Sequence, residues 1–452
     1  MLKINIITFT SIIISKTIIK LSKLLFKGGT NFPGKVALKL NKNVLAKVAK
    51  DYNIILITGT NGKTTTTSMV YNMLKKSHKK VITNSTGANM LPGIVSCFIE
   101  NYSFRKSAAD KYAVIEVDEA NLVLVTDQVS PKIITITNLF RDQLDRYGEV
   151  YTTLKKILAG IKKVPESVLV LNGDESLLGD LELTNKCIYY GFGTELDENK
   201  IIDINADAKF CKKCKAPYNY NFITYNHLGS FYCSNCGYKR PELSYTIDSV
   251  IQQTSKSSAV IINGEEYLIN QPGTYNIYNG LCAYSISREL GLDISAISNA
   301  LKSTASSFGR QEIINIDEKQ VKIVLVKNPA GFDEAIKTIS LDTENVTTAF
   351  LLNDNYADGR DVSWIWDVNF EALRNLSQSS ILISGIRLYD MAVRLKIAGL
   401  PSERFILCED YEKLLDSIKT SSSSSIYILA TYTAMISFRK FLYGKGHIKN
   451  LW

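Results

Sequence analysis

The sequence of 452 residues predicts an α/β protein with two α/β domains, the first of which contains a small metal-binding insertion. A glycine-rich loop directly after an apolar run is typical of an anion-binding strand–loop–helix unit. Short apolar runs alternate with helical patterns on both sides of about residue 310. Four cysteines form two CxxC pairs. We therefore expect a helical segment over residues 1–50, a central domain over 51–310 with an insertion at about 205–240, and a C-terminal domain over 311–452.

The composition narrows the class of protein. Apolar residues make up 45% and charged residues 21% of the chain, which is ordinary for a folded soluble enzyme. The net charge of +9 suits an anionic ligand or an anionic membrane surface and does not choose between them. Basic residues are spread along the chain, with a short run only over 209–215, so we expect no nucleic-acid partner.

The N-terminal segment is rich in Ile and Leu but is interrupted by Lys3, Lys16, Lys20 and Lys23. Its uncharged stretch from residue 4 to 15 is too short to span a bilayer. Two interpretations remain open. The segment is either a helix docked on the next domain or a basic amphipathic helix lying on a membrane surface, and both suit a cytoplasmic protein.

The glycine-rich loop follows the predicted buried strand at 54–57 and ends at a helix start. Its glycines allow main-chain N–H groups to close on phosphate oxygens, and the helix N-terminus favours an anion. Lys63 can neutralise phosphate charge, and the Thr64 hydroxyl can bind Mg²⁺. We therefore predict a nucleotide phosphate site. Its residues are Gly59, Thr60, Asn61, Gly62, Lys63, Thr64 and Thr65.

Further strands are predicted at residues 80–83, 112–117, 133–137 and 168–171, in the alternating order of a doubly wound parallel sheet. The strand at 112–117 ends in the acids Glu116, Asp118 and Glu119. A carboxylate at such a strand end, near a phosphate loop, is placed to hold Mg²⁺. Asp118 and Glu119 suit a loop and helix start equally well.

Two CxxC pairs, Cys211/Cys214 and Cys233/Cys236, are separated by 18 residues, which is the spacing of a four-thiolate zinc ribbon. A redox pair is the alternative. We predict a Zn²⁺ site because the short segment between the pairs is too small to fold without such a link. The remaining cysteines are scattered and are expected to be buried apolar residues: Cys97, Cys187, Cys282 and Cys408.

The C-terminal domain contains two distinctive loops among its predicted strands, which lie at residues 321–326, 347–352, 381–384, 405–408 and 426–430. The first loop is KNPAGFDEA at residues 327–335. The second follows a strand end and carries Asp354, Asp358 and Asp361. Asp361 could simply cap the helix that starts at Ser363.

The loop GTNGKT at 59–64 resembles that of the Mur ligase family. So do the segment at 138–150, which contains Asp142 and Asp145, and the LNGDES turn, which contains Asn172 and Asp174. The family fold is a Mur ligase-like P-loop ATPase domain followed by a Rossmann-like α/β domain. The resemblance implies an ATP-dependent ligase that joins an amine to a carboxylate through an acyl-phosphate. It also implies that Glu116 holds Mg²⁺.

The same resemblance assigns two further parts of the nucleotide site. The segment at 271–284 resembles the one that meets adenine in the family, which implies Asn276 and Asn279 as adenine-side residues. FGRQE at 308–312 resembles the junction before the last domain, so we expect Arg310 to contact phosphate across the domain cleft.

Three features together resemble the MurT family of synthetase subunits of lipid II isoglutaminyl synthase: the four-cysteine insertion, KNPAG, and ADGRDVSWIWD at 357–367. This resemblance implies ATP-dependent amidation of the α-carboxyl of D-glutamate in lipid II, with ammonia from a GatD-type glutamine amidotransferase subunit. It implies that Asp361 orients the partner's Cys–His pair as a third member. We also expect catalysis by Lys63 and by Mg²⁺ near Glu116.

The chain reaches the phosphate loop after a short N-terminal stretch, which favours a lipid-linked substrate at the cytoplasmic face of the membrane. A stand-alone Mur or folylpolyglutamate-type amino-acid ligase is the alternative. KNPAG stands where those ligases often have DYAHNP, which argues against this alternative.

Overall fold

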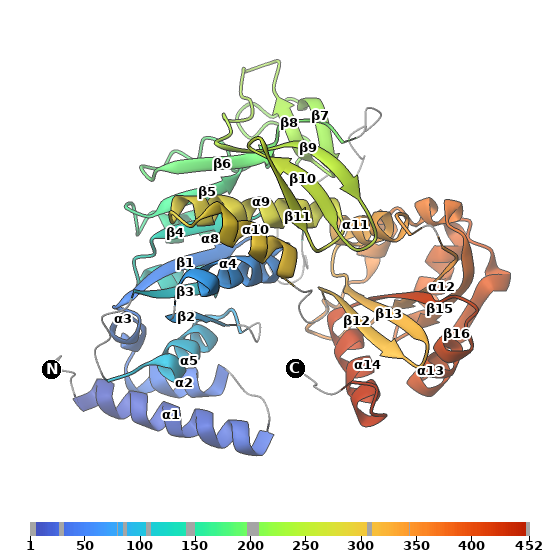
Figure 1. The fold of residues 1–452 in the computed structure, drawn as a ribbon, viewed down its shortest axis with the longest axis horizontal. Coiled ribbons are helices and arrows are strands. Elements are labelled where there is room, and N and C mark those ends of the chain that lie inside the picture. The colour runs from blue at the N-terminus through green and yellow to red at the C-terminus, as the bar shows by residue number, and fades with distance from the viewer. Residues whose placement is uncertain are drawn as a thin grey trace.

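The computed structural model describes residues 6–26, 31–78, 80–84, 88–104, 110–141, 150–196, 208–304, 310–342 and 344–448. Within these ranges the chain forms two large sheets and one separate hairpin (Figure 1). The first sheet draws its strands from residues 52–269 and the second from residues 310–430. This architecture confirms the predicted α/β class, while the domain boundaries near residues 50 and 310 remain predictions.

Three helices precede the first strand: α1 (Ile6–Phe26), α2 (Asn31–Leu40) and α3 (Val44–Val48). One face of α1 packs on α2 and on α5 (Leu91–Asn101), as Figure 1 shows. Ile12 is fully buried there, and the hydroxyls of Ser11 and Ser15 donate to main-chain carbonyls of α2 at 3.1 and 3.2 Å. On this face, α1 is therefore a helix docked on the rest of the protein, which is the first of the two interpretations. Among the described helices, none has the length and apolar character needed to cross a membrane.

Strand β1 (Tyr52–Thr58) lies inside the first sheet, whose described strands follow the order β11-β10-β9-β6-β5-β4-β1-β3-β2. Its neighbours β3 (Lys111–Glu116) and β4 (Ile133–Ile136) are parallel to it, and Ile57 is in register with Glu116 and Thr135. The winding direction changes next to β1, and such a switch point is where ligands bind in open parallel sheets. The other strands are β2 (Lys80–Thr83), β5 (Val168–Asn172), β6 (Cys187–Phe192), β9 (Tyr245–Gln253), β10 (Ser258–Ile262) and β11 (Glu265–Ile269).

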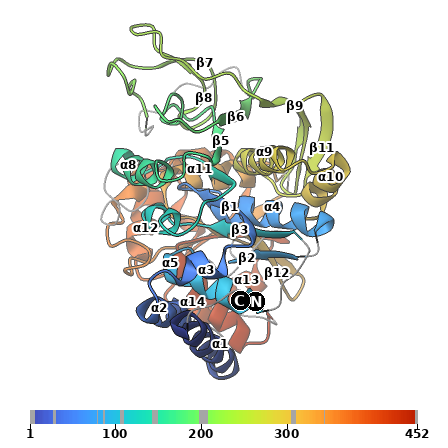
Figure 2. The ribbon, with the colours of Figure 1, turned by 90° about the vertical axis from the view of Figure 1, so that its left-hand side faces the viewer.

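Helices cover both faces of this sheet because β1 is apolar on both sides (Figures 1 and 2). Ile55 and Ile57 pack with α4 (Lys63–Ser77), α9 (Thr274–Glu289) and α10 (Ile294–Ser303). Ile54 and Leu56 pack with α5, α6 (Leu122–Thr126) and α8 (Val150–Ile161). The two cores fix the strand end that leads into the phosphate loop.

The four-cysteine insertion carries the hairpin β7 (Asn219–Tyr225) and β8 (Leu228–Tyr232), which pair antiparallel. Figure 1 shows this hairpin above the first sheet, near β6 and β9. The insertion has a small core of its own in which Tyr218, Phe231 and Tyr238 pack beside the cysteines. It is therefore a compact unit built onto the first sheet.

The second sheet has the described strand order β12-β13-β17-β14-β15-β16, in which β12 and β13 form an antiparallel hairpin and the remaining pairs are parallel. On one face lie α11 (Pro329–Ile339), η1 (Ser363–Asp367), η2 (Phe370–Asn375) and α12 (Leu388–Ile397), and on the other α13 (Tyr411–Thr420) and α14 (Tyr432–Gly444). The strands are β12 (Arg310–Ile316), β13 (Lys319–Leu325), β14 (Val346–Leu351), β15 (Gln378–Ser384), β16 (Phe405–Cys408) and β17 (Ser425–Ala430). A short 3₁₀ helix, η3 (Ser402–Arg404), precedes β16.

Candidate functional site

The phosphate loop joins β1 to α4 and contains two glycines at left-handed φ angles, Gly59 at 118° and Gly62 at 83°. A Cβ atom on Gly59 would lie 2.4 Å from the Thr137 hydroxyl oxygen, and one on Gly62 would lie 2.1 Å from Asn279 Oδ1. Both the backbone angle and the close approach therefore require glycine. The loop keeps its main-chain groups and the start of α4 close together, as an anion site needs.

Lys63 is the first residue of α4 and is almost fully buried. Its ammonium forms an ion pair with Glu119 Oε1 at 2.8 Å and donates to the main-chain carbonyls of Gly59 and Thr60. These acceptors hold the positive charge at the base of the loop. Glu119, which the sequence left open as a metal or loop residue, therefore lies against Lys63.

Thr64 and Glu116 meet at the end of β3, where the Thr64 hydroxyl donates to Glu116 Oε2 at 2.8 Å. The other carboxylate oxygen accepts from Asn89 Nδ2 at 3.0 Å. The side chain of Asn84 bonds both the main-chain N–H and the carbonyl of Glu116 and so fixes its backbone. A hydroxyl and a carboxylate are hard oxygen ligands, so this pair fits Mg²⁺.

Asp118 has hydrogen-bond partners in the turn that follows β3. Its Oδ1 accepts from the main-chain N–H of Ala120 at 3.1 Å and from Asn121 Nδ2 at 3.0 Å. These bonds close the turn that leads into α6. They agree with the interpretation of Asp118 as a loop residue at a helix start.

Asn276 and Asn279, which the resemblance predicts on the adenine side, lie in the first turns of α9, and both are buried. Asn276 donates to the carbonyl of Pro272 at 2.7 Å and accepts from Asn279 Nδ2 at 3.0 Å. The hydroxyl of Thr66 on α4 donates to Asn279 Oδ1 at 3.4 Å. The two amides are thus fixed against the helix that begins at the phosphate loop.

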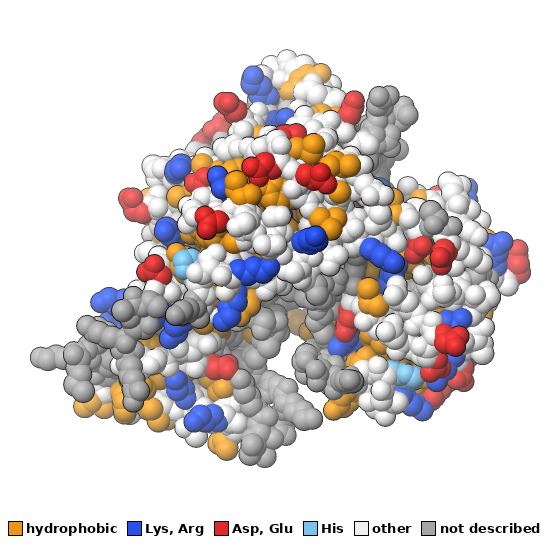
Figure 3. Space-filling view, in the orientation of Figure 1, with side chains coloured by type: hydrophobic (Ala, Val, Ile, Leu, Met, Phe, Trp, Pro, Cys, Tyr) orange, Lys and Arg blue, Asp and Glu red, His pale blue; other side chains and the backbone are white. Residues whose placement is uncertain are grey.

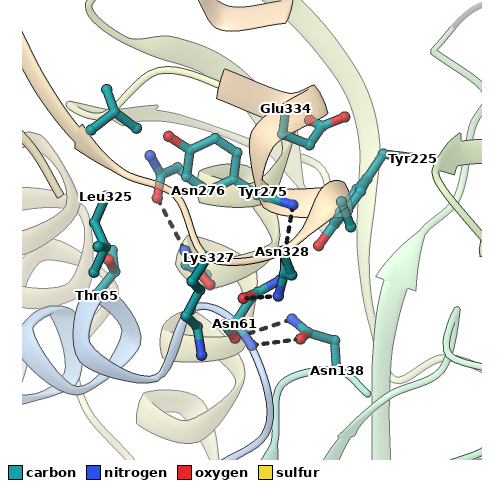
Figure 4. Close-up of a pocket in the computed structure, with 15 residues that line it drawn as sticks. Asn61, Thr65, Asn138, Tyr225, Tyr275, Asn276, Leu325, Lys327, Asn328 and Glu334 are labelled. Atoms are coloured by element: carbon teal, nitrogen blue, oxygen red, sulfur yellow. Dashed lines mark hydrogen bonds between the residues drawn. The ribbon is translucent and has the colours of Figure 1, made fainter. Parts of the chain in front are cut away.

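A pocket lies between the phosphate loop, α9 and the C-terminal domain (Figure 4). Asn61 links its two sides, because its side-chain amide pairs with that of Asn328 at 3.2 and 3.4 Å while its main chain pairs with Asn138. Asn328 belongs to KNPAG and also caps α11 by accepting from the N–H of Gly331 at 2.9 Å. The rest of the wall includes Thr65, Tyr225, Tyr275, Lys327 and Glu334.

The sulfur atoms of Cys211, Cys214, Cys233 and Cys236 all lie within 4.8 Å of one another. Two of the separations are 3.6 Å (Cys211 to Cys236) and 3.4 Å (Cys214 to Cys233). Four thiolates at about 2.3 Å from a tetrahedral zinc ion lie about 3.8 Å apart, so the cluster fits Zn²⁺. Of the other cysteines, three are buried as expected and Cys187 is half-buried.

Buried charged groups tie this ribbon to the first sheet. Arg240 pairs with Asp174 Oδ1 at 2.8 Å, and Asp174 Oδ2 accepts from Tyr278 OH at 2.6 Å. Burial raises the pKa of Asp174, while the charge of Arg240 acts in the opposite direction. His227 Nε2 lies 2.8 Å from Glu175 Oε2, and both side chains have no exposed surface.

The same contacts reach the pocket beside the phosphate loop. Phe140 lies against His227 and stacks on Tyr225, with ring centroids 5.0 and 5.6 Å apart. The main chain of Phe140 exchanges two hydrogen bonds of 3.1 Å with the hydroxyl of Thr60 in the phosphate loop. Tyr225 itself lines the pocket. The hairpin of the ribbon therefore supplies one aromatic wall of the site.

Replacing Cys214 with serine should lower the Tm and weaken ATP binding, because the ribbon hairpin carries Tyr225. An aromatic contact worth about 1 kcal/mol corresponds to roughly a fivefold higher Kd. Thermal melts and nucleotide titration test this expectation. Cys187→Ser is the matched control and should leave both quantities unchanged; a Kd for ATP that stays the same in Cys214→Ser would contradict the link.

The three aspartates of the second C-terminal loop have different environments. Asp354 pairs with Arg387 at 2.7 Å. Asp358 is buried and accepts from the N–H of Thr433 at 2.7 Å, and burial raises its pKa. Asp361 is exposed, and one of its oxygens accepts from the N–H of Ser363 at 2.8 Å. The capping interpretation of Asp361 thus describes a real contact. Hydrogen bonds from the side chain and then from the main chain of Ser363 lower the pKa of the Asp361 carboxyl.

Exposed apolar side chains line a groove beside Asp361. Trp366 of η1 and Tyr389 and Val393 of α12 are each about half exposed and line it together with Asp361. We call this group of four side chains the Asp361 groove. It combines a fixed carboxylate with apolar contact area.

For three of the predicted residues the structure describes no side chain. Asp142 and Asp145 lie in the segment 142–149, which the structure does not describe. Arg310 is the first residue of β12, and nothing is described of its side chain.

Asn172 of the LNGDES turn is described. It is buried and donates to the carbonyl of Thr137, directly behind the phosphate loop.

Five residues of the pocket wall were not predicted as site residues from the sequence: Asn138, Tyr225, Tyr275, Asn328 and Glu334. Only Asn328 carried a local signal, because Asn before Pro is a typical helix cap. Tyr225 comes from the ribbon, and only the three-dimensional structure brings it to the phosphate loop.

Two family models match the chain. The Mur ligase middle domain matches residues 57–238, and the MurT ligase C-terminal model matches residues 325–435. The chain is 41% identical to the lipid II isoglutaminyl synthase (glutamine-hydrolyzing) subunit MurT of Streptococcus pneumoniae, over 92% of each protein. It is 36% identical to the protein of the same name from Staphylococcus aureus, over 86% of this chain and 88% of that protein.

Solved structures share the fold at lower identity. A pseudomurein peptide ligase type C from Methanothermus fervidus superposes with a TM-score of 0.67 at 18% identity, over 97% of both chains. MurF from Acinetobacter baumannii gives a TM-score of 0.64 at 14% identity, over 91% of this chain and 80% of that one. These likenesses confirm the predicted Mur ligase fold.

Proposed function

Because the chain belongs to the MurT family of lipid II isoglutaminyl synthase subunits, we propose that it is the ATP-consuming synthetase subunit of such an enzyme. The family makes it a Mur-type, ATP-dependent carbon–nitrogen ligase. In the proposed reaction the α-carboxylate of D-glutamate in lipid II receives the γ-phosphoryl group of ATP. Ammonia then displaces phosphate from the acyl-phosphate and leaves the carboxamide of D-isoglutamine.

One observation supports this proposal most strongly: the phosphate loop faces a pocket that the C-terminal domain completes. Asn61, Gly62 and Thr65, around the N-terminus of α4, lie on one side, and Lys327 and Asn328 lie on the other. Phosphoryl transfer needs positioning and positive charge around the transferred group more than it needs acid–base chemistry. A pocket between two domains can supply both when it closes.

Each proposed residue then has a distinct task. Main-chain N–H groups of the loop bind phosphate oxygens, and Lys63 exchanges its pairing with Glu119 for the phosphate charge. Thr64 and Glu116 would hold Mg²⁺, which neutralises charge on the phosphates when it is bound. Asn276 and Asn279 face the adenine side, and Arg310 is proposed to contact phosphate across the pocket.

Replacing Glu116 with glutamine should raise the Mg²⁺ concentration needed for half-maximal ATP hydrolysis by at least about tenfold. Loss of a residue that only hydrogen-bonds to a metal ligand already lowers metal affinity by about that factor. Magnesium titration of ATPase activity measures the effect. Asp118→Asn is the matched control, because the Asp118 side chain closes its own turn. If Asp118→Asn shifted the titration and Glu116→Gln did not, the metal assignment would move to Asp118.

Ammonia is proposed to come from a GatD-type glutamine amidotransferase that docks on the Asp361 groove. The groove offers Trp366, Tyr389 and Val393, each about half exposed, and large aromatic side chains dominate many protein interfaces. The hydrogen bond from Ser363 lowers the pKa of Asp361, so this carboxylate is ionised at neutral pH. An ionised, oriented carboxylate is suited to hold a histidine of the partner in its catalytic tautomer.

The proposed function is tested by ATP consumption with lipid II and ammonium chloride or glutamine, each with and without a co-expressed amidotransferase. We expect ammonium to support turnover by the chain alone and glutamine to support it only with the partner. A stand-alone Mur or folylpolyglutamate-type ligase would instead consume ATP with an amino acid and a soluble peptide or folate. That outcome would replace the proposed substrate while leaving the ATP site in place.

A further inference from the structure

Basic residues are spread along the chain, but their excess over acidic residues lies at the N-terminus. Residues 1–50 contain ten lysines and no Asp, Glu or Arg. The remaining residues hold 43 basic and 44 acidic side chains, which is a net charge of −1. The net charge of +9 therefore originates entirely in the segment that forms α1, α2 and α3.

The same segment presents an apolar surface to solvent. The side of α1 opposite α2 and α5 exposes Ile6 (78%), Ile7 (53%), Phe9 (48%), Ile13 (41%), Ile14 (42%) and Leu21 (51%). Phe104 extends this surface, since its ring lies 5.3 Å from that of Phe9. We call these seven side chains the α1 surface. Scattered apolar residues are ordinary on soluble proteins, but a continuous set along one helix marks an interaction site.

Within the described chain, α1 packs on α2 and α5 through the other side of the helix. Ile12, Ser11 and Ser15 are buried on the opposite side of the helix, where the two hydroxyls bond α2. The lysines behave differently from one another. Lys16 donates to the carbonyl of Tyr102, while the other lysines of this segment with described side chains are exposed: Lys20, Lys35, Lys39, Lys42, Lys47 and Lys50.

The charge around the α1 surface distinguishes between two binding partners, a second copy of the chain and a lipid bilayer. A second copy of the chain would bring another ten lysines against the first ten, so repulsion opposes self-association. An anionic bilayer attracts each lysine near its surface and accepts the apolar side chains below its headgroups. Figure 3 shows hydrophobic and basic side chains together on the lobe that carries α1, and a hollow between that lobe and the C-terminal domain.

We propose that the α1 surface and the lysines of residues 1–50 dock this protein on an anionic lipid bilayer. The apolar side chains enter the interface, and the lysines contact lipid phosphates around them. The proposal concerns the bilayer lipids themselves and does not depend on the proposed amidation. A helix docked on the protein through one side and on lipid through the other accounts for both interpretations of the segment.

The test is cosedimentation of the purified chain with vesicles of phosphatidylcholine alone or with added phosphatidylglycerol. We expect binding to the anionic vesicles only, weakened by salt. Phe9→Ser/Ile13→Ser and, separately, Lys39→Glu/Lys42→Glu should each reduce binding by at least about tenfold. Matched controls change equally exposed residues elsewhere and should bind as the natural chain does: Ile251→Ser/Ile313→Ser and Lys302→Glu/Lys440→Glu.

Three results would overturn the proposal: no binding of the natural chain to anionic vesicles, equal losses in the controls, or a dimer in light scattering that the Phe9→Ser/Ile13→Ser change separates. Amidation of detergent-dispersed substrate should be unchanged in all four variants. Failure of membrane docking and failure of the proposed reaction therefore give different results.

Discussion

Replacing Lys63 with alanine should lower ATP-dependent turnover by about 10²–10³-fold, with ammonium and with glutamine alike. The reason is that Lys63 supplies the buried positive charge at the start of α4, where the phosphate loop closes. The loss should appear mainly in kcat if the charge acts on the transferred phosphoryl group. Steady-state assays with saturating ATP measure it.

The control for Lys63→Ala must separate chemistry from folding, because the change leaves Glu119 buried without its cation. The double variant Lys63→Ala/Glu119→Gln removes that uncompensated charge and should restore the Tm without restoring turnover. Lys75→Ala, on the exposed side of α4, should be unaffected. Recovery of activity in the double variant would mean that Lys63 has only a structural role.

Replacing Asp361 with asparagine should lower the rate of glutamine-dependent amidation by about 10³–10⁴-fold and leave ammonium-dependent amidation unchanged. The amide keeps the size of the side chain and can still accept from the N–H of Ser363, so η1 should keep its cap. It removes the negative charge that is proposed to hold the partner's histidine. Parallel assays with the two nitrogen sources give the ratio directly.

Asp390→Asn is the matched control for Asp361→Asn, because Asp390 lies next to the Asp361 groove and is also exposed. It should leave glutamine use unchanged while the complex still forms. Equal losses in the two variants would indicate a general charge effect on docking. Loss of ammonium-dependent activity in Asp361→Asn would place Asp361 at the synthetase site and contradict the assignment.

Much of the fold could be predicted from the sequence because parallel strands buried on both faces are continuous apolar runs. The strands predicted at 80–83 and 405–408 match β2 and β16 residue for residue. The edge hairpins of the first sheet were missed. In β9 only one residue of nine is buried, so Tyr245–Gln253 lacks the apolar run on which the prediction depended.

The residues of the candidate site likewise fall into those that local sequence predicts and those that only the fold brings together. Residues within one strand–loop–helix unit, such as Lys63 and Thr64, could be predicted as site residues because the spacing of such residues along the chain is typical of a phosphate loop. Tyr225 and Glu334 were not found, because contacts between distant segments place them at the pocket. The pairing of Glu119 with Lys63 was equally invisible, since a loop acid and a metal ligand look alike in sequence.

The most direct test of the proposed function uses glutamine labelled with ¹⁵N in its side-chain amide, together with ATP, lipid II, this chain and its amidotransferase partner. We expect tandem mass spectrometry to find the label in the α-carboxamide of the D-glutamate residue, and no label to be transferred when the partner or ATP is omitted. Label at another position, or amidation from glutamine by this chain alone, would contradict the proposed function.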